Sequence, residues 1–236
     1  MKLCVFIFAG GNSKGLPGKN IKLLNGKPLI VYSIEMALKI PSVDKVFVST
    51  EDKHIAKISK LAGAVIIDRP HSLAKDKTPE WKAWKHAIKW VNKKFGEFKI
   101  FISLPTTSPL RTLNDIKRAI SKKSKKNADI CLAVTPASHS PYFNMVKKSK
   151  NNFVKLANKT KSNIFRRQDA PKLFYITTTV YVLDAKFIMN NNNMFDGKIT
   201  SIEVPKNRAV DIDDIHDFNF VESILYNNLS KEKKCY

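Results

Sequence analysis

The chain has 236 residues and a formal net charge of +22 at pH 7, from 42 Lys and Arg against 20 Asp and Glu. A hydrophobic fraction of 43%, with 14 Phe distributed along the whole length, excludes intrinsic disorder for the bulk of the chain and predicts one sizeable domain. No apolar run approaches the roughly 20 residues that cross a bilayer, and the apolar start lacks a signal-peptide cleavage pattern. We therefore expect a cytoplasmic protein with no membrane partner.

Cysteine usage indicates a reducing compartment. Cys4, Cys131 and Cys235 form no CxxC pair and are too few for a disulfide framework. We expect packing roles for them and no structural zinc site.

The positive charge raises the hypothesis of a nucleic-acid partner. Only six of the basic residues are Arg, and the densest basic run, residues 122–126, contains no aromatic side chain. Nucleic-acid-binding proteins usually concentrate basic residues on one face and interleave aromatic side chains for base stacking. We interpret this run as a solvated helix end and expect no nucleic-acid partner, although the surplus charge can raise the association rate of a small polyanion.

Short apolar runs alternate with amphipathic stretches over the first 135 residues. This alternation is typical of a parallel sheet covered by helices. The predicted strands are residues 2–8, 45–49, 64–67, 99–104 and 129–134. The predicted helices are residues 28–40, 52–62, 80–95 and 114–123.

The pattern changes after Pro136, because residues 141–172 hold their apolar side chains in short hairpin-like runs among Lys and Asn. We predict that this segment is an inserted arm. The regular pattern then returns as a strand over 173–183, a strand over 200–204 and a helix over 215–229. The whole chain, 1–236, is expected to form a single domain that carries the arm at 140–170.

The arm contains more large apolar side chains than a segment of its length can bury alone. They are Tyr142, Phe143, Met145, Phe153 and Phe165. Because exposed apolar patches mark interaction surfaces, we predict that the arm mediates dimerisation.

A glycine-rich stretch, residues 9–20 (AGGNSKGLPGKN), directly follows the first predicted strand. A loop of this kind at the carboxyl end of a strand presents several backbone N–H groups, and its two lysines add positive charge, which predicts a phosphate-binding loop. It is not a Walker A motif, which would need Gly where Ser13 stands and Ser or Thr where Asn20 stands, and it is not GxGxxG. Taken alone, a mobile turn with solvated lysines is an equally good interpretation.

A second motif is expected at the same edge of the sheet, and a third carries two carboxylates. Residues 104–111 (LPTTSPLR) follow another predicted strand and place hydroxyl groups between prolines, which suits a rigid polar wall. In the extended segment 210–214 (VDIDD), Asp211 and Asp213 point to the same side. Two carboxylates so placed can hold Mg²⁺ beside phosphates. The structural alternatives for Asp211 are a cap of the helix that starts near Ile215 or an ion pair with Arg208.

Together the three motifs resemble those of the acylneuraminate (CMP-sialic acid) cytidylyltransferases. Residues 9–20 are similar to the family's A-R-G-G-S-K-G-L-P-G-K-N, residues 104–111 to its P-T-S-P-L-R and residues 210–213 to its D-I-D. Further matches are Val48-Ser49-Thr50, Arg69-Pro70, residues 166–171 (RRQDAP) and Tyr181. The resemblance covers nearly the whole chain in the family's order, so it is more specific than any single motif.

This resemblance implies a nucleotide-diphospho-sugar transferase fold, Rossmann-like, with three α/β/α layers and a mostly parallel sheet. It implies CTP and a nine-carbon acidic 2-keto sugar as substrates, Mg²⁺ as cofactor, and a homodimer in which the arm helps to close each sugar site. The anomeric hydroxyl of the sugar would attack the α-phosphorus of CTP, giving a CMP-sugar and pyrophosphate. Positioning and charge neutralisation, which lysines and a divalent metal supply, are what such a transfer needs.

The resemblance also implies roles for individual residues. The implied nucleotide-binding residues are Ala9, Gly10, Gly11, Ser13, Lys14, Lys19, Asn20 and Arg69, with the lysines on the triphosphate and with Asn20 and Arg69 on the nucleoside. The implied sugar-binding residues are Thr106, Thr107, Ser108, Arg167 and Gln168, with Arg167 facing the sugar carboxylate. Asp211 and Asp213 are the implied Mg²⁺ ligands, and Lys14, Lys19 and Asp211 are the implied catalytic residues.

The sequence departs from the family pattern at two positions. Gly10 stands where the family has Arg, which leaves open a lower turnover or a transfer of that charge to a nearby Lys. Thr177 stands where many members have the Asn of an N-G-A-I-Y-like run, which leaves the sugar open.

Three functional alternatives therefore remain. The acceptor is legionaminic, pseudaminic, deaminated neuraminic or an eight-carbon ulosonic acid; the nucleotide is not CTP; or the chain is a catalytically weak relative that binds polyanions. Without the resemblance, Arg69 would be interpreted as a surface or helix-capping cation and Arg167 as a solvated arm residue.

Overall fold

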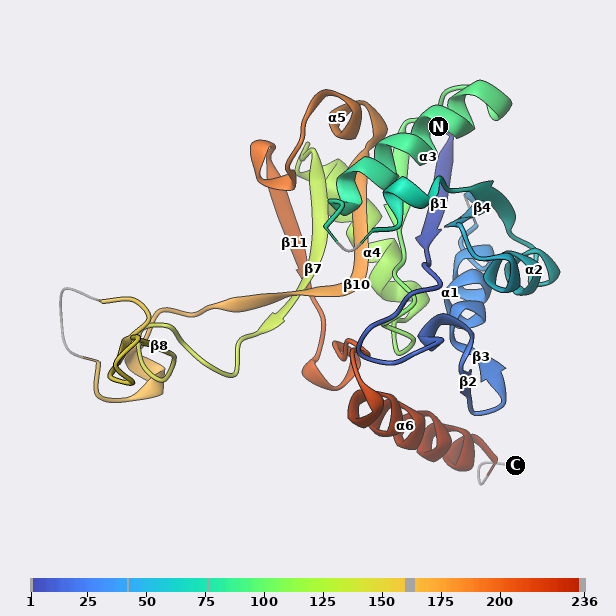
Figure 1. The fold of residues 1–236 in the computed structure, drawn as a ribbon. Helices are drawn as coiled ribbons and strands as arrows, with labels where there is room; N and C mark the ends of the chain where they lie inside the picture. The colour runs from blue at the N-terminus through green and yellow to red at the C-terminus, as the bar shows by residue number, and fades with distance from the viewer. Residues whose placement is uncertain (1, 42, 76, 160–163, 234–236) are drawn as a thin grey trace.

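The computed structural model describes residues 2–41, 43–75, 77–159 and 164–233, with side chains up to residue 227. Its centre is a seven-stranded sheet in the order β11-β7-β10-β6-β1-β4-β5 (Figure 1). The strands of this sheet are β1 (Leu3–Phe8), β4 (Val43–Thr50), β5 (Val65–Asp68), β6 (Ile100–Ser103), β7 (Ile130–Pro136), β10 (Phe174–Asp184) and β11 (Ile199–Glu203). Only β10 runs antiparallel to its neighbours in the sheet.

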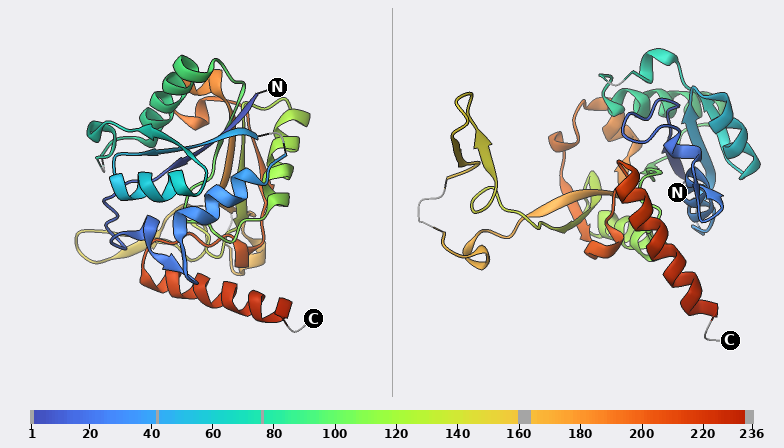
Figure 2. Two further views of the ribbon diagram at one scale, coloured as in Figure 1. Left: turned by 90° about the vertical axis from the view of Figure 1, so that its right-hand side faces the viewer. Right: turned by 60° about the horizontal axis from the view of Figure 1, so that its bottom comes forward.

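Helices cover both faces of the sheet, which makes three layers (Figures 1 and 2). Their bounds are α1 (Leu29–Leu38), α2 (Lys53–Leu61), α3 (Glu80–Phe95), α4 (Leu113–Lys125), α5 (Ala185–Asn190) and α6 (Ile215–Lys233). On one face α1, α2 and α4 bury an aliphatic core, and on the other α3 and α5 bury an aromatic core around Phe6, Phe101 and Trp84. The sheet is therefore buried on both faces, as its continuous apolar strands require.

Local sequence signals fix where these helices begin and end. The Asp52 carboxylate accepts the N–H groups of His54 and Ile55 at the start of α2, and Thr112 and Asp115 form a capping box at the start of α4. Gly96, with a φ of 80°, follows the last residue of α3. These caps place the loops between strand and helix at the edges of the sheet.

The order of the strands reverses at β1, because the chain first adds β4 and β5 on one side and then β6 on the other. In open α/β sheets, ligands bind outside the carboxyl ends of the strands at such a switch point. The loops that follow β1 and β6 contain the glycine-rich stretch and residues 104–111, so both open at this place, at the lower edge of the sheet in Figure 1.

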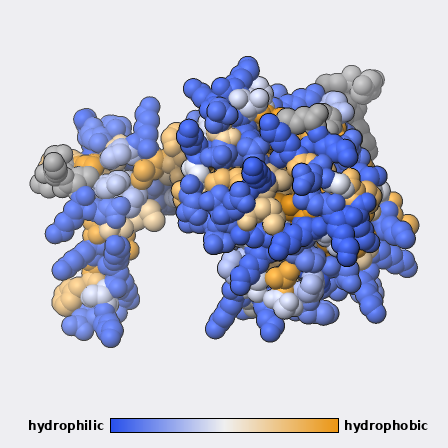
Figure 3. All heavy atoms as spheres, turned by 90° about the horizontal axis from the view of Figure 1, so that it is seen from above, coloured by the Kyte–Doolittle hydropathy of each residue, from blue (hydrophilic) through white to orange (hydrophobic). Residues whose placement is uncertain are grey.

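The arm leaves the sheet as an extension of β7 and β10 and carries a small antiparallel pair, β8 (Val146–Lys148) and β9 (Val154–Leu156). It projects to one side of the body (Figures 1 and 2). Seen from above, it forms a separate lobe on which hydrophobic patches lie among hydrophilic side chains (Figure 3). Nothing in the described part of the chain covers those patches, since Phe153 is 74% exposed and Phe165 81% exposed.

All seven predicted strands and all five predicted helices are present, with ends within a few residues of those expected from the sequence. The predictions missed the hairpin of β2 (Leu23–Leu24) and β3 (Lys27–Pro28), and the short helix α5. Among the described residues, no helix is long and apolar enough to span a membrane.

Candidate active site

Hydrogen bonds connect the three sequence motifs to one another at the carboxyl edge of the sheet. The Lys19 ammonium donates to the carbonyl oxygen of Ile212 at 2.6 Å, and the Ile212 N–H donates to the carbonyl oxygen of Thr107 at 2.9 Å. Gly15 packs so closely on the Asp213 carbonyl that a Cβ at position 15 would overlap it. The glycine-rich loop, the wall at 104–111 and the segment 210–214 therefore form one continuous surface.

Asn20 links the glycine-rich loop to the wall. Its amide Nδ2 donates to the Gly10 carbonyl at 2.9 Å, and its Oδ1 accepts the Thr106 hydroxyl at 2.6 Å. Asn20 and Thr106 are both buried. Both side chains thus hold the site together, which leaves less of each free for the nucleoside and sugar contacts that the sequence predicts.

The exposed part of the glycine-rich loop contains the other predicted nucleotide-binding residues. Lys14 is exposed and Ser13 is half-buried. Ala9 is buried, and its N–H donates to the Ser49 carbonyl at 3.1 Å, which continues the β1 to β4 pairing. The loop is therefore anchored at its start and open at its tip.

Asp211 has an unsatisfied buried acceptor. Its Oδ1 is buried and has no hydrogen-bond partner among the described residues. Burial raises the pKa of this carboxyl, and the charge of Asp213 raises it further, while the hydroxyls of Thr107 and Thr178 and the charge of Lys19 act in the opposite direction. A carboxylate in this state is destabilised unless a cation reaches it.

The structural alternatives for Asp211 are taken by other residues. Arg208 pairs with the buried carboxylate of Asp115 instead. Asp214 caps α6, because its Oδ1 accepts the N–H groups of His216 and Asp217. Neither a cap nor an ion pair with Arg208 therefore explains why Asp211 is present.

These carboxylates fit a magnesium ion. Asp213 is 78% exposed, and its Oδ1 lies 3.7 Å from the Lys19 ammonium. The described residues contain no group of three or more His, Cys, Asp or Glu that could hold a metal. Two carboxylates, one with an unsatisfied oxygen, suit a hard cation that completes its shell with water and phosphate oxygens.

A hydroxyl from β10, which the sequence analysis did not identify, adds to those of the wall. The pairing of β10 with β7 is irregular between Thr177 and Tyr181. Thr177 points inward to the Ala133 carbonyl, whereas the Thr178 hydroxyl lies 2.7 Å from that of Ser108. Three consecutive threonines inside a strand were the only signal for this feature in the sequence.

Arg111, the last residue of the wall, is fully enclosed. Its guanidinium donates to the Thr179 carbonyl at 2.8 Å and to the Ser33 hydroxyl at 2.6 Å, and it also bonds to the Pro105 carbonyl. Burial lowers its pKa to about 9. Arg111 thus joins α1, the wall and β10, and it fixes the shape of the site from behind.

Arg69 is neither a surface cation nor a helix cap. It is buried beside the glycine-rich loop, where its Nη2 lies 3.1 Å from the position of a Cβ on Gly10. Its guanidinium pairs with Glu51, a residue that the sequence analysis did not select. The positive charge next to Gly10 therefore comes from an Arg, rather than from the nearby Lys considered above.

The structure does not bring Arg167 and Gln168 to this surface. They lie on the arm and line a cavity of about 400 Å³ with His139, Lys172 and Glu203. Arg167 donates to the Ala137 carbonyl at 2.8 Å. The predicted sugar-binding residues are therefore divided within one chain between the wall and the arm.

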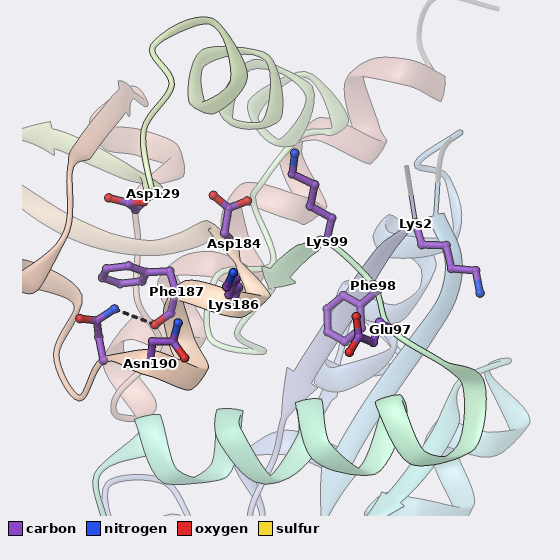
Figure 4. A pocket seen from close by; sticks show the side chains of 10 residues that line it. Lys2, Glu97, Phe98, Lys99, Asp129, Asp184, Lys186, Phe187 and Asn190 are labelled. Carbon is purple, nitrogen blue, oxygen red and sulfur yellow. Dashed lines mark hydrogen bonds between the residues drawn. The ribbon is translucent and has the colours of Figure 1, made fainter.

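A second cavity, of about 750 Å³, lies at the opposite edge of the sheet, where the parallel strands begin (Figure 4). Lys2, Lys99 and Lys186 are among its lining residues, and in Figure 4 the side chains of Lys2 and Lys99 point away from each other. None of the residues selected from the sequence lines it. The cavity's basic groups do not converge, so it is a poorer candidate for a phosphate site than the carboxyl edge.

Comparisons with known proteins agree with this geometry. A solved structure of a CMP:2-keto-3-deoxy-manno-octonic acid synthetase complexed with CTP superposes with a TM-score of 0.72, at 16% identity, over 97% of this chain and 100% of that one. That likeness confirms the predicted fold class, a three-layer nucleotide-sugar transferase fold.

Sequence relatives agree as well. The chain is 32% identical over 226 residues to a CMP-N,N'-diacetyllegionaminic acid synthase of Campylobacter jejuni, with 94% of each chain covered. It is 26% identical to an N-acylneuraminate cytidylyltransferase of Streptococcus agalactiae, over 100% of this chain and 57% of that one. The cytidylyltransferase family model matches residues 4–229. The chain belongs to the cytidylyltransferase family and is a nucleotidyltransferase, as its three motifs predicted.

Proposed function

We propose that the protein transfers CMP from CTP to the anomeric hydroxyl of a nine-carbon, sialic-acid-like ulosonic acid and releases pyrophosphate. The observation that carries this proposal is the buried, unpartnered Oδ1 of Asp211, which lies beside Lys19 and the glycine-rich loop. A site that collects lysines, loop N–H groups and an unsatisfied carboxylate suits a triphosphate together with a divalent cation.

The residues of the loop divide the work of binding the triphosphate. Lys14, at the exposed tip, and Lys19, held against Ile212, bring positive charge to the phosphates. The Gly11 N–H donates to Glu51, whereas the N–H groups of Asn12 and Ser13 lie in the same loop and can donate to phosphate oxygens. Because phosphoryl transfer is accelerated mainly by positioning and charge stabilisation, these groups can act without forming a covalent intermediate.

Asp211 and Asp213 would hold Mg²⁺. The ion would neutralise the phosphates and polarise the α-phosphoryl group. Without it, the two carboxylates repel the triphosphate, and the raised pKa of Asp211 reflects part of that unfavourable field.

The wall and the arm would share the sugar. On the body, hydroxyls lie beside Asp211; they belong to Thr107, Ser108 and Thr178. On the arm, Arg167 offers a guanidinium and Gln168 an amide. We infer that the arm of a second copy brings its Arg167 to the sugar carboxylate, which makes the homodimer the active form. Exposed apolar side chains on the arm support this inference: Met145, Val146, Phe153, Val154, Leu156, Phe165, Phe174, Tyr175 and Ile176.

The preferred acceptor is a sialic-acid-like sugar, and the identities to relatives favour the legionaminic alternative over N-acetylneuraminic acid. The synthase that acts on diacetyllegionaminic acid is 32% identical over 94% of its length, against 26% over 57% for the N-acylneuraminate enzyme. Thr177 is buried and its hydroxyl bonds to the Ala133 carbonyl, so this chain lacks the Asn that many members have at that position.

The test is pyrophosphate release from each of the four nucleoside triphosphates. Each is offered N-acetylneuraminic, N,N'-diacetyllegionaminic, pseudaminic, deaminated neuraminic and eight-carbon ulosonic acids, with Mg²⁺ and with EDTA. Release from CTP alone, with a nine-carbon acid and only with the metal, supports the proposal. Release from another nucleotide contradicts it, and salt-dependent nucleic-acid binding without any release would support the polyanion-binding alternative.

A further inference from the structure

The Glu51 side chain lies under the glycine-rich loop and bonds to its backbone, although Glu51 belongs to none of the three motifs. It directly follows β4, at the same carboxyl edge as the loops after β1 and β6. Its side chain and that of Arg69 are each only 8% exposed. A buried carboxylate at the edge of a nucleotide site, facing where phosphates would bind, needs a physical reason.

The reason lies in what the two carboxylate oxygens accept. Oε1 accepts the backbone N–H of Gly11 at 2.8 Å. Oε2 accepts Nε of Arg69 at 3.1 Å and Nη2 at 2.5 Å. One side chain therefore connects the loop after β1, its own position after β4 and Arg69 after β5.

Hydrogen bonding keeps this carboxylate charged. Burial by itself would raise the pKa of Glu51, but the Arg69 guanidinium and the Gly11 N–H outweigh it and hold the pKa below its usual value. At neutral pH, Glu51 is therefore ionised and forms an ion pair with Arg69. Its net field toward the phosphate site is small, because the carboxylate and the guanidinium compensate each other.

The two glycines of the loop fit closely around this pair. A Cβ on Gly10 would lie 3.1 Å from Nη2 of Arg69 and 3.4 Å from Oε1 of Glu51. A Cβ on Gly11 would lie 2.7 Å from Oδ2 of Asp52, the cap of α2. The backbone at 10–11 therefore rests directly on the pair, so the conformation of the loop depends on where the pair lies.

Glu51 does not use all the N–H donors of the Arg69 guanidinium. Glu51 uses Nε and Nη2 of Arg69, and within the part of the chain that the structure describes Nη1 has no hydrogen-bond partner. The guanidinium lies beside Gly10 through the same Nη2 that bonds to Glu51, so Glu51 sets where this positive group stands next to the loop.

We propose that Glu51 is a positioning residue for CTP. It fixes the N–H of Gly11 and so the shape of the phosphate-binding loop, and it holds the Arg69 guanidinium beside Gly10, where the loop would receive the nucleotide. The inference rests on the proposed function for the identity of the ligand, but the effect of Glu51 on the loop does not. Glu51 itself does not touch the nucleotide.

The test compares Glu51→Gln and Glu51→Ala with a matched control. The control is Asp184→Asn, which breaks a partly buried ion pair, Asp184 to Lys123 at 2.8 Å, where the parallel strands begin. For each protein we would measure the melting temperature, the Kd of CTP with Mg²⁺ and the hydrogen exchange of loop amides 9–18 in the free protein.

We expect Glu51→Ala to raise the Kd at least 30-fold and to speed exchange of the Gly11 amide at least tenfold. Glu51→Gln, which keeps an acceptor for Gly11 but loses the charge, should raise the Kd five- to tenfold. Asp184→Asn should lower the melting temperature by a similar amount and leave both other readouts within twofold.

Two outcomes would overturn the inference. One is that both Glu51 variants bind CTP within twofold of the wild type; the other is that Asp184→Asn weakens CTP as much as they do, since a purely structural role predicts that result. If the wild type binds no CTP, the proposed function fails, and the exchange experiment alone decides whether Glu51 holds the loop. Should Glu51→Ala not fold, Glu51→Gln carries the comparison.

Discussion

The carboxyl edge of the sheet and the arm differ in how their side chains are satisfied. At the carboxyl edge, Asn20 and Lys19 bond to neighbouring motifs, and among the described residues there the buried carboxylate oxygen without a hydrogen-bond partner is Oδ1 of Asp211. On the arm, large apolar side chains such as Phe153 and Phe165 are mostly exposed. Under the proposed function, the first region would need only a cation and a ligand, whereas the second would need another surface. The nucleotide half of the site would then be preformed, and the acceptor half would depend on assembly.

The largest effect is expected from removing the charge of Asp211. Asp211→Asn should reduce turnover roughly 100-fold or more, the scale of losing one preorganised charge-stabilising group, because the metal loses its buried ligand. It should not lower the melting temperature, since the raised pKa means that this carboxylate destabilises the metal-free fold. Steady-state pyrophosphate release and thermal melts with EDTA measure the two effects.

Asp214→Ala is the matched control in the same segment. Asp214 accepts two N–H groups at the start of α6, so its loss should lower the melting temperature and leave turnover intact. If Asp211→Asn behaves like this control, the metal site is wrong.

Charged substitutions on the apolar face of the arm should prevent dimerisation without weakening nucleotide binding. The double variant Phe153→Glu and Phe165→Glu places two charges on the exposed apolar face, and it should convert a dimer to a monomer in sedimentation velocity. Turnover with the sugar should fall at least tenfold, while the Kd of CTP stays within twofold. Unchanged sedimentation would contradict the assignment of the arm as the dimer contact, and a lost CTP affinity would contradict the division of the site.

Lys14→Ala tests whether the glycine-rich loop binds the triphosphate. A cation aimed at charge that develops on the triphosphate is worth about 2 kcal/mol, so kcat/KM should fall about 30-fold. The exposed position of Lys14 predicts little change in melting temperature. A near-normal kcat/KM would contradict this role of Lys14 and would mean that Lys19 and the backbone N–H groups stabilise the triphosphate without it.

The features that the sequence predicted best are those in which a local residue pattern also determines what is buried in the folded chain. Period-2 and period-3.6 patterns predicted the strands and long helices, since burial on both faces leaves continuous apolar runs. The motifs at 9–20 and 104–111 were predicted to open at the same edge because each follows a strand. The bonds from Lys19 to Ile212 and from Ile212 to Thr107 show that the segment 210–214 lies there too.

The residues that sequence reasoning missed depend on contacts between distant segments. Glu51 and Arg69 are 18 positions apart, and an acidic residue after a strand carries no local sign that it will be buried. Thr178 faces the wall because β10 is irregular there, and no turn residue marks that irregularity. The separation of Arg167 from the wall is likewise a matter of where the arm projects, which periodicity does not encode.

The smallest effect concerns the pH dependence of stability, and it compares two carboxyls of the same edge. Glu51 has a lowered pKa, so its ion pair adds stability above the unfolded value of about 4.3, and this contribution is lost as the pH falls through the lower, folded value. Asp211 has a raised pKa, so its charge costs stability at neutral pH, and this cost disappears as the pH falls through the folded value.

The two variants should therefore shift the melting temperature in opposite directions at pH 7 without metal. Glu51→Gln should melt a few degrees below the wild type and Asp211→Asn at or above it. As the pH falls from about 7 to about 3, the Asp211 difference should shrink first, because the pKa of Asp211 is raised, and the Glu51 difference only below the ordinary Glu value of about 4.3, because the pKa of Glu51 is lowered. Melts over that range, in buffers with EDTA and constant ionic strength, measure both. A Glu51→Gln difference that grows with acidity would mean that the pair with Arg69 does not stabilise the fold, and the support of the loop would then have to come from Asn20 and Asp52 instead.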